Sequence, residues 1–162
     1  MRDRSKNVKR ERPARSHPVD AVPAAGTNVL FDVWLVSRAV TGALDAALAP
    51  TGLTADEFGV YSVLTSSDVM TPTDLARWMA APPTTVSSYV KRLEGRGHLV
   101  RERNPDDGRS YVLRLTTSGR AAHRSGGKAF LPVLERIVTA LGAEEPAVRR
   151  ALESLRVAVD EE

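Results

Sequence analysis

Hydroxyl and cationic side chains gather on one side of a helix that the sequence predicts from Pro83 to Arg96 or Gly97. On a wheel of 100° per residue, apolar Val86, Val90 and Leu93 share one face of this helix. The opposite side carries hydroxyls and cations, namely Thr84, Thr85, Ser88, Lys91 and Arg92. Such side chains can bind phosphate oxygens and base edges in the major groove of DNA. A solvated amphipathic helix has the same pattern, so this helix alone does not decide the function.

A shorter helix is predicted just before it, and the pair would form a helix-turn-helix. Thr71 is a candidate N-cap, with Pro72 at the first helical position and Asp74 in the first turn. This helix is expected to end near Met79. Residues 80–82 would then make the tight connection to the second helix.

A β-hairpin is predicted after the second helix, with strands at 99–104 and 111–116. In the second strand apolar residues stand at alternate positions, which gives a period of two. Residues 105–109, between the strands, have the Pro, Asp and Gly of a turn. Four arginines lie on or beside this hairpin: Arg101, Arg103, Arg109 and Arg114.

Residues 71–116 resemble the MarR family of winged helix-turn-helix transcription regulators. The residues that match the family's pattern are Asp74, Leu75, Ala76, Thr85, Val86, Ser87, Val90, Leu93, Gly97, Val100, Arg101, Asp107, Arg109, Leu115, Thr116 and Gly119. The resemblance implies that the second helix enters the major groove and that the hairpin wing reaches the neighbouring minor groove. Arg109 matches the family's wing-tip arginine, and Asp107 matches the residue that helps to hold the wing. Gly108 replaces a bulkier residue of many relatives, which would leave the wing tip more mobile.

This resemblance implies a transcriptional regulator that binds specific sequences of double-stranded DNA, and a ligand-responsive repressor by analogy with the family. A homodimer would read a pseudo-palindromic operator with half-site centres roughly 10 base pairs apart. The candidate DNA-binding residues are Thr84, Thr85, Ser87, Ser88, Lys91, Arg92 and Arg109. The alternative is a winged-helix module for protein–protein interaction without specific DNA binding, whose basic face meets an acidic partner.

The expected fold is mainly α-helical with a small β-hairpin wing, in a single domain over residues 26–162. The winged helix-turn-helix would occupy 54–116, and helices from both termini, at 28–48 and 117–160, would form a dimerisation region. The first helix has a broader apolar face than a small domain buries alone, so we infer a partner surface. The last helix has an apolar stripe of Val148, Leu152, Leu155 and Val159. Closure of a single chain's own core is the alternative role for that stripe.

Capping signals divide the helices. Thr54 and Glu57 form a capping box for a helix that begins at Ala55, and Thr116 caps a long helix through about Leu141. That long helix contains Ser125-Gly126-Gly127 and Pro132. Each Gly costs about 1 kcal/mol against Ala, and Pro about 3 kcal/mol or more. We therefore predict a kink or a break between Gly126 and Pro132.

Relatives often release DNA when a small aromatic or phenolic effector binds between the dimer core and the reading lobe. The resemblance therefore implies a ligand pocket, for which the candidate residues are Trp34, Arg38, Phe58, Trp78 and His123. Trp34 could line such a pocket, but an aromatic residue at helical spacing is more often in the core, and we favour the core.

Charge is unevenly distributed along the chain, whose net charge is +3. Residues 1–15 hold seven basic and two acidic residues, residues 16–76 hold one and seven, and residues 77–120 hold nine and four. Two basic islands on an otherwise acidic chain indicate a defined footprint on nucleic acid. Residues 1–25 are rich in Arg and Pro, so we expect a disordered basic arm, which is either a plain solvated tail or a source of phosphate contacts.

Other classes of function find little support. The chain has no Cys, which excludes disulfides and cysteine-based redox sensing. His17, His98 and His123 have no metal-ligand spacing, and the Gly-x-Ser-x-Gly motif is absent. We therefore expect no catalytic residues, no metal and no cofactor. Neither a membrane span nor a secretory signal is visible, so we expect a cytoplasmic protein.

Overall fold

The computed structural model describes residues 28–67, 69–104 and 107–160, so the predicted N-terminal arm lies outside the described residues. Contacts divide the chain into two units, Met1–Ser37 and Arg38–Glu162. Helix α1 (Val29–Leu48) belongs to both units. No helix of the described ranges is long and apolar enough to span a membrane.

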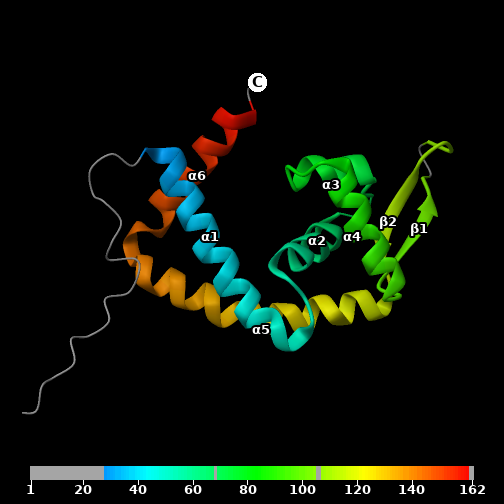
Figure 1. The fold of residues 1–162 in the computed structure, drawn as a ribbon, viewed down its shortest axis with the longest axis horizontal. Coiled ribbons are helices and arrows are strands. Elements are labelled where there is room, and N and C mark those ends of the chain that lie inside the picture. Colours follow the sequence, from blue (N-terminus) through cyan, green and yellow to red (C-terminus); the bar gives the residue numbers. More distant parts are fainter. Residues whose placement is uncertain (1–27, 68, 105–106, 161–162) are drawn as a thin grey trace, which may run out of the picture. The chain divides into compact units, whose positions relative to one another are not determined.

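The elements follow one another in the order that the sequence predicts, with helices before and after one hairpin along the chain (Figure 1). After α1 come η2 (Ala49–Thr51), α2 (Ala55–Ser66), α3 (Pro72–Trp78), α4 (Pro83–Gly95), β1 (Leu99–Arg103), β2 (Tyr111–Leu115), α5 (Thr117–Leu141), η3 (Gly142–Glu144) and α6 (Glu145–Asp160). The mainly α-helical class with a small hairpin is therefore confirmed. Helix and strand ends agree with the predicted ones to within one or two residues.

Side-chain caps begin the helices at the predicted positions. The Thr54 hydroxyl accepts a hydrogen bond from the Glu57 N–H at 3.1 Å, and the Glu57 carboxylate accepts one from the Thr54 N–H. At the start of α5, the Thr116 hydroxyl accepts from the Gly119 N–H at 3.1 Å. These caps satisfy amide groups that have no partner within their own helices, which explains why the helices begin where they do.

The hydrophobic core of the second unit joins α2, α3, α4 and both strands. Its most deeply buried side chains include Tyr61 of α2, Leu75 of α3, Leu93 of α4 and Leu113 of β2. Because α2 contributes buried residues on several sides, it serves as the scaffold against which α3, α5 and β2 pack. Ion pairs of Glu57 join α4 to it.

The hairpin is antiparallel, with Leu99 opposite Leu115 and Arg103 opposite Tyr111. The second strand is also bonded to the segment before α3, because the Leu113 N–H donates to the Met70 carbonyl at 2.8 Å. The hairpin is therefore fixed to the helix-turn-helix by backbone as well as by side chains.

Helix α5 is continuous from Thr117 to Leu141 with Pro132 inside it, so the predicted break is wrong. Gly126 is buried where α5 meets α2, and a Cβ there would lie only 2.7 Å from Cδ2 of Phe58. Gly126 therefore allows close packing, and that packing offsets its poor helix propensity. Pro132 is exposed, and the helix continues through it. A bend at Pro132 stays a prediction.

The described part of the first unit is the amino-terminal half of α1. Within it Phe31 and Trp34 stack with ring centroids 5.7 Å apart, and Trp34 is 55% exposed. Among the described residues Trp34 is therefore not buried, contrary to the expectation that it lies in the core. The helical wheel identifies an apolar face, but it does not say whether the same chain covers that face.

Candidate nucleic-acid interface

Helix α4 has the two faces that its sequence predicts. Val86, Val90 and Leu93 are buried, each with at most 2% of its surface exposed. The candidate contact residues Thr84, Ser87, Ser88, Lys91 and Arg92 are exposed, and Thr85 is half-buried. The structure thus brings six of the seven candidates together on one helix, with an apolar face that fixes them to the core.

Helix α3 supports α4 through a short turn. The Thr71 hydroxyl accepts from the Asp74 N–H and donates to the Asp74 carboxylate at 2.6 Å, which lowers the pKa of that carboxyl below its ordinary value. The turn between the helices places Ala80 at φ 45°, and the Ala81 N–H returns to the Ala76 carbonyl. Leu75 is fully buried and joins α3 to the core. These contacts give the pair the geometry of a helix-turn-helix.

The hairpin is tied to α4 by one arginine. Arg101 of β1 donates to both carboxylate oxygens of Glu94, at 2.7 and 2.8 Å, and to the Tyr111 hydroxyl at 3.1 Å. Its guanidinium also lies 4.8 Å from the centre of the Tyr111 ring. A bidentate pair of this kind has a fixed geometry, so Arg101 holds the wing at one angle to α4.

The described side of the wing tip is held by Asp107. Its carboxylate accepts from the Arg109 N–H at 3.0 Å, and its carbonyl accepts from the Ser110 N–H, also at 3.0 Å. Asn104 donates to the Ser110 hydroxyl at 2.8 Å. Asp107 thus lies where it can support the wing, as the resemblance implies, and the Arg109 side chain remains exposed beyond it. Residues 105–106 of the predicted turn lie outside the described residues.

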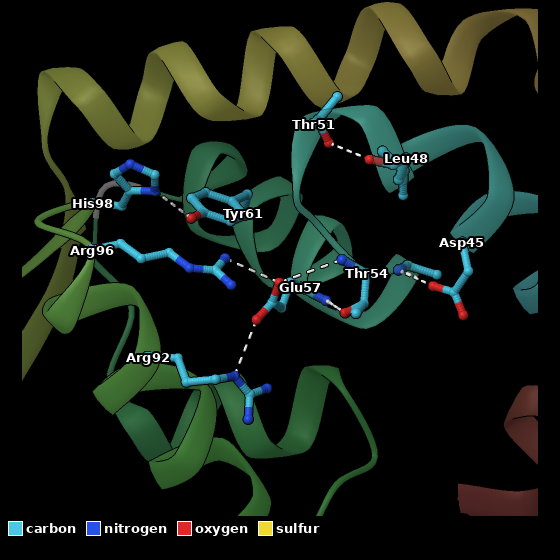
Figure 2. A network of polar contacts seen from close by, with 10 residues as sticks. Asp45, Leu48, Thr51, Thr54, Glu57, Tyr61, Arg92, Arg96 and His98 are labelled. Atoms are coloured by element: carbon cyan, nitrogen blue, oxygen red, sulfur yellow. Dashed lines mark hydrogen bonds and ion pairs between the residues drawn. The ribbon is translucent and has the colours of Figure 1, made fainter.

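Arg92 has a partner that sequence reasoning missed. Its Nε donates to Oε1 of Glu57 at 3.1 Å, and Nη1 of Arg96 donates to Oε2 of the same carboxylate at 3.1 Å (Figure 2). The Glu57 side chain is only 3% exposed. Burial lowers the pKa of Arg96, but the hydrogen bond and the charge of Glu57 outweigh it and raise that pKa above its ordinary value. Glu57 was visible in the sequence only as a helix cap, because its arginine partners lie 35 and 39 residues away.

Four of the five candidate pocket residues lie in the second unit, where they fall at separate places. Phe58 and His123 stack at 5.3 Å, whereas Trp78 is 70% exposed and lines a separate hollow of about 590 Å³ with Arg77, Ala80, Glu153 and Arg156. Arg38 is exposed at the start of the second unit. Two of the five candidates are therefore neighbours in the packing between α2 and α5.

His123 fixes α5 to α2 through both ring nitrogens. Nε2 lies 3.2 Å from the Ser62 hydroxyl, and Nδ1 lies 3.3 Å from the Thr65 hydroxyl. Burial, with a smaller contribution from the charge of Arg124, lowers the pKa of His123. The Ser62 and Thr65 hydroxyls also donate to the Phe58 and Tyr61 carbonyls, at 2.9 and 2.7 Å, so both face the ring as acceptors, and the neutral ring has one N–H to donate.

Comparisons with known proteins agree on one class. Residues 51–110 match the model of the MarR family. The chain is 28% identical over 124 residues to the HTH-type transcriptional repressor Rv2887 of Mycobacterium tuberculosis, which covers 76% of this chain and 89% of that protein. It is 27% identical over 89 residues to the multiple antibiotic resistance protein MarR of Escherichia coli, covering 55% of this chain and 62% of that one.

Solved structures extend the likeness to the fold. The transcriptional repressor CouR bound to a 23-mer DNA duplex superposes with a TM-score of 0.70 and 27% identity, covering 83% of this chain and 93% of that one. Rv2887 in complex with salicylic acid superposes with a TM-score of 0.64 and 27% identity, covering 82% of this chain and 98% of that one.

A helix-turn-helix followed by a hairpin that is fixed to its second helix defines a winged helix-turn-helix protein. With the match over 51–110 and these relatives, the winged helix-turn-helix of this chain is that of the MarR family.

Proposed function

We propose that this protein regulates transcription by binding specific sequences of double-stranded DNA as a homodimer. The observation that carries the proposal is the exposed face of α4. Hydroxyls and cations cover that face, while Val86, Val90 and Leu93 fix the helix from behind. CouR, which has the same fold, is a repressor whose structure includes a DNA duplex. The candidate contacts are Thr84, Thr85, Ser87, Ser88, Lys91 and Arg92 in the major groove, with Arg109 in the minor groove.

The proposal of a homodimer is supported by apolar surface that the single chain leaves uncovered. Large apolar side chains are exposed on α1, α5 and α6, among them Val36, Leu134, Val138, Leu152 and Val159. Exposed apolar surface on three helices is typical of a protein–protein interface. A two-fold axis through such an interface would present two copies of α4 to one pseudo-palindromic operator.

We also propose that a small aromatic or phenolic effector releases the DNA, which makes the protein a ligand-responsive repressor. Rv2887, at 27% identity, has been solved with salicylic acid. Trp78 and Arg77 would offer such a molecule an aromatic face and a cation at the rim of the hollow beside α3. A regulator of this kind would work in the cytoplasm, and the proposal includes no catalytic step.

The deciding experiment is selection of bound duplexes from a random pool, followed by a salt titration on the recovered sequence. We expect a symmetric motif with half-sites roughly 10 base pairs apart. We also expect log affinity to fall linearly with log salt, at a slope of about −0.9 per neutralised phosphate. If the selection recovers no motif, and salt does not weaken the binding of duplex DNA, the result would favour the protein–protein interaction module instead.

A further inference from the structure

One buried carboxylate joins the scaffold helix to the helix that carries the candidate DNA contacts. Glu57 lies in the first turn of α2, and both of its carboxylate oxygens are engaged (Figure 2). Oε1 accepts from Arg92, and Oε2 accepts from Arg96 and from the Thr54 N–H. Figure 2 shows the two arginines reaching toward this carboxylate from α4.

Arg92 lies in the last turn of α4 and Arg96 is its C-cap, so the two side chains, four residues apart, lie one above the other on the same face of the helix end. A carboxylate that binds both side chains at 3.1 Å therefore opposes rotation of α4 about its axis and sliding along it. The apolar contacts of Val86, Val90 and Leu93 hold the helix on the core but are not directional. The ion pairs to Glu57 are directional, so they fix the rotation of α4 that the apolar contacts leave free.

A second contact acts on the same arginine. The Arg92 guanidinium lies 4.7 Å from the centre of the Tyr89 ring, and the Tyr89 hydroxyl donates to Asp56 at 2.8 Å. Asp56 precedes Glu57 in the first turn of α2. The first turn of α2 thus restrains Arg92 from two directions, while 48% of its side chain stays exposed.

We propose that Glu57 is a positioning residue for DNA recognition, which holds Arg92 and Arg96 so that α4 meets the groove at one rotation. This inference rests on the proposed function and adds a determinant of specificity to it. Glu57 touches no DNA in this scheme; it acts through the two arginines.

The proposal predicts opposite effects on specific and non-specific binding. Glu57→Gln removes one negative charge near the cationic side of α4, which favours attraction to any duplex. The same change frees the arginines, which disfavours the operator because base contacts depend on geometry. The ratio of operator affinity to affinity for an unrelated duplex should therefore fall on the order of tenfold. A change of that size is within the range of interaction energies measured between residues in contact.

The experiment measures both affinities at one salt concentration, for the full chain and its variants, with a selected operator and an unrelated duplex of equal length. Glu135→Gln is the charge-matched control, because Glu135 lies exposed on α5. Its ratio should equal that of the natural protein. Adding Glu57→Gln to the pair Arg92→Ala and Arg96→Ala should change the ratio less than twofold, because the residues through which Glu57 acts are already gone.

A role in stability alone would lower both affinities by the folded fraction and leave the ratio unchanged, and that result would overturn the proposal. If Glu57→Gln fails to fold, Arg96→Lys replaces it, since lysine keeps the charge but loses the planar fork. An unchanged ratio for folded Arg96→Lys would then overturn the proposal. Equal affinity of the natural protein for operator and unrelated duplex would instead refute the proposed function, and the positioning role with it.

Discussion

Some cationic side chains of the winged helix-turn-helix are held in ion pairs and others are not. Arg92 and Arg96 bind Glu57, Arg101 binds Glu94, and Arg114 binds Glu102 at 2.7 Å. Within the part of the chain that the structure describes, Lys91, Arg103 and Arg109 have no ion pair. Exposed cations without a carboxylate partner attract phosphate most strongly, because no protein charge has to be displaced.

Arg109 tests the role of an exposed cation that has no ion pair. Arg109→Ala should weaken operator binding by roughly tenfold, about 1.4 kcal/mol, and should make the salt slope about one unit shallower. Only its backbone N–H is bonded to Asp107, so folding and dimerisation should not change. Fluorescence anisotropy over a salt series measures the affinity, and Lys128→Ala on the exposed side of α5 is the matched loss of charge. Unchanged affinity at every salt concentration would contradict the role at the wing tip.

His123 makes stability depend on pH. Burial lowers its pKa in the folded state, so near the ordinary value of about 6.5 the unfolded chain binds more protons than the folded chain does. The contribution of His123 to stability is therefore complete above about pH 6.5 and is lost as the pH falls below that value. Urea midpoints should fall between pH 7.5 and pH 5.5, and less steeply in His123→Gln. An equal fall in both proteins would exclude His123 as the cause.

Among the helices and strands, local signals predicted existence and starting points well, because caps and turns are made by neighbours in sequence. Thr54, Thr71 and Thr116 all cap the helices that their spacing indicates. Long-range contacts were not predictable in this way. The break in α5 was wrong because Gly126 packs on Phe58, and the ion pairs of Glu57 span more than thirty residues.

Val90 tests the orientation of α4. Val90→Asp should unfold the second unit, because an unpaired charge at a site only 2% exposed costs more than about 4 kcal/mol. Lys91→Asp, one position further on, should fold normally and lose DNA affinity, because that side chain is exposed. Circular dichroism and urea unfolding report on both variants. A stable Val90→Asp protein that lost only DNA binding would show that the apolar face had been assigned to the wrong side.

Two glycines of α5 should respond in opposite directions to alanine. At Gly119 a Cβ would overlap the His98 carbonyl oxygen and lie 2.9 Å from the carbonyl carbon, so Gly119→Ala should lose about 1 to 3 kcal/mol or more. At Gly127 a Cβ would meet nothing within 4 Å, so Gly127→Ala should gain about 0.5 to 1 kcal/mol from helix propensity. Urea unfolding measures both values. Equal effects of the two substitutions would contradict the close approach of α5 to the His98 backbone.

At the scale of the whole molecule, sequence pattern predicted which helix faces are apolar but not what covers them. The stripe on α6 is exposed in one chain, with Leu152 at 53% and Val159 at 63%. Closure of the single chain's own core, the alternative for this helix, therefore does not account for these residues. A second copy would present the same apolar surface under two-fold symmetry.

Leu152 tests the dimer directly. Leu152→Lys should raise the dimer dissociation constant by at least about tenfold, because an interface that buries Leu152 would have to desolvate an unpaired ammonium group. Ser154→Lys adds the same charge almost opposite on the helix, where the Ser154 hydroxyl is exposed, and should leave the dimer intact. Sedimentation equilibrium gives both constants, and operator binding should fall with the dimer, since a single α4 reads only one half-site. If Leu152→Lys and Ser154→Lys dimerise as the natural protein does, α6 lies outside the interface and the two copies of α4 must be paired by α1 and α5 alone.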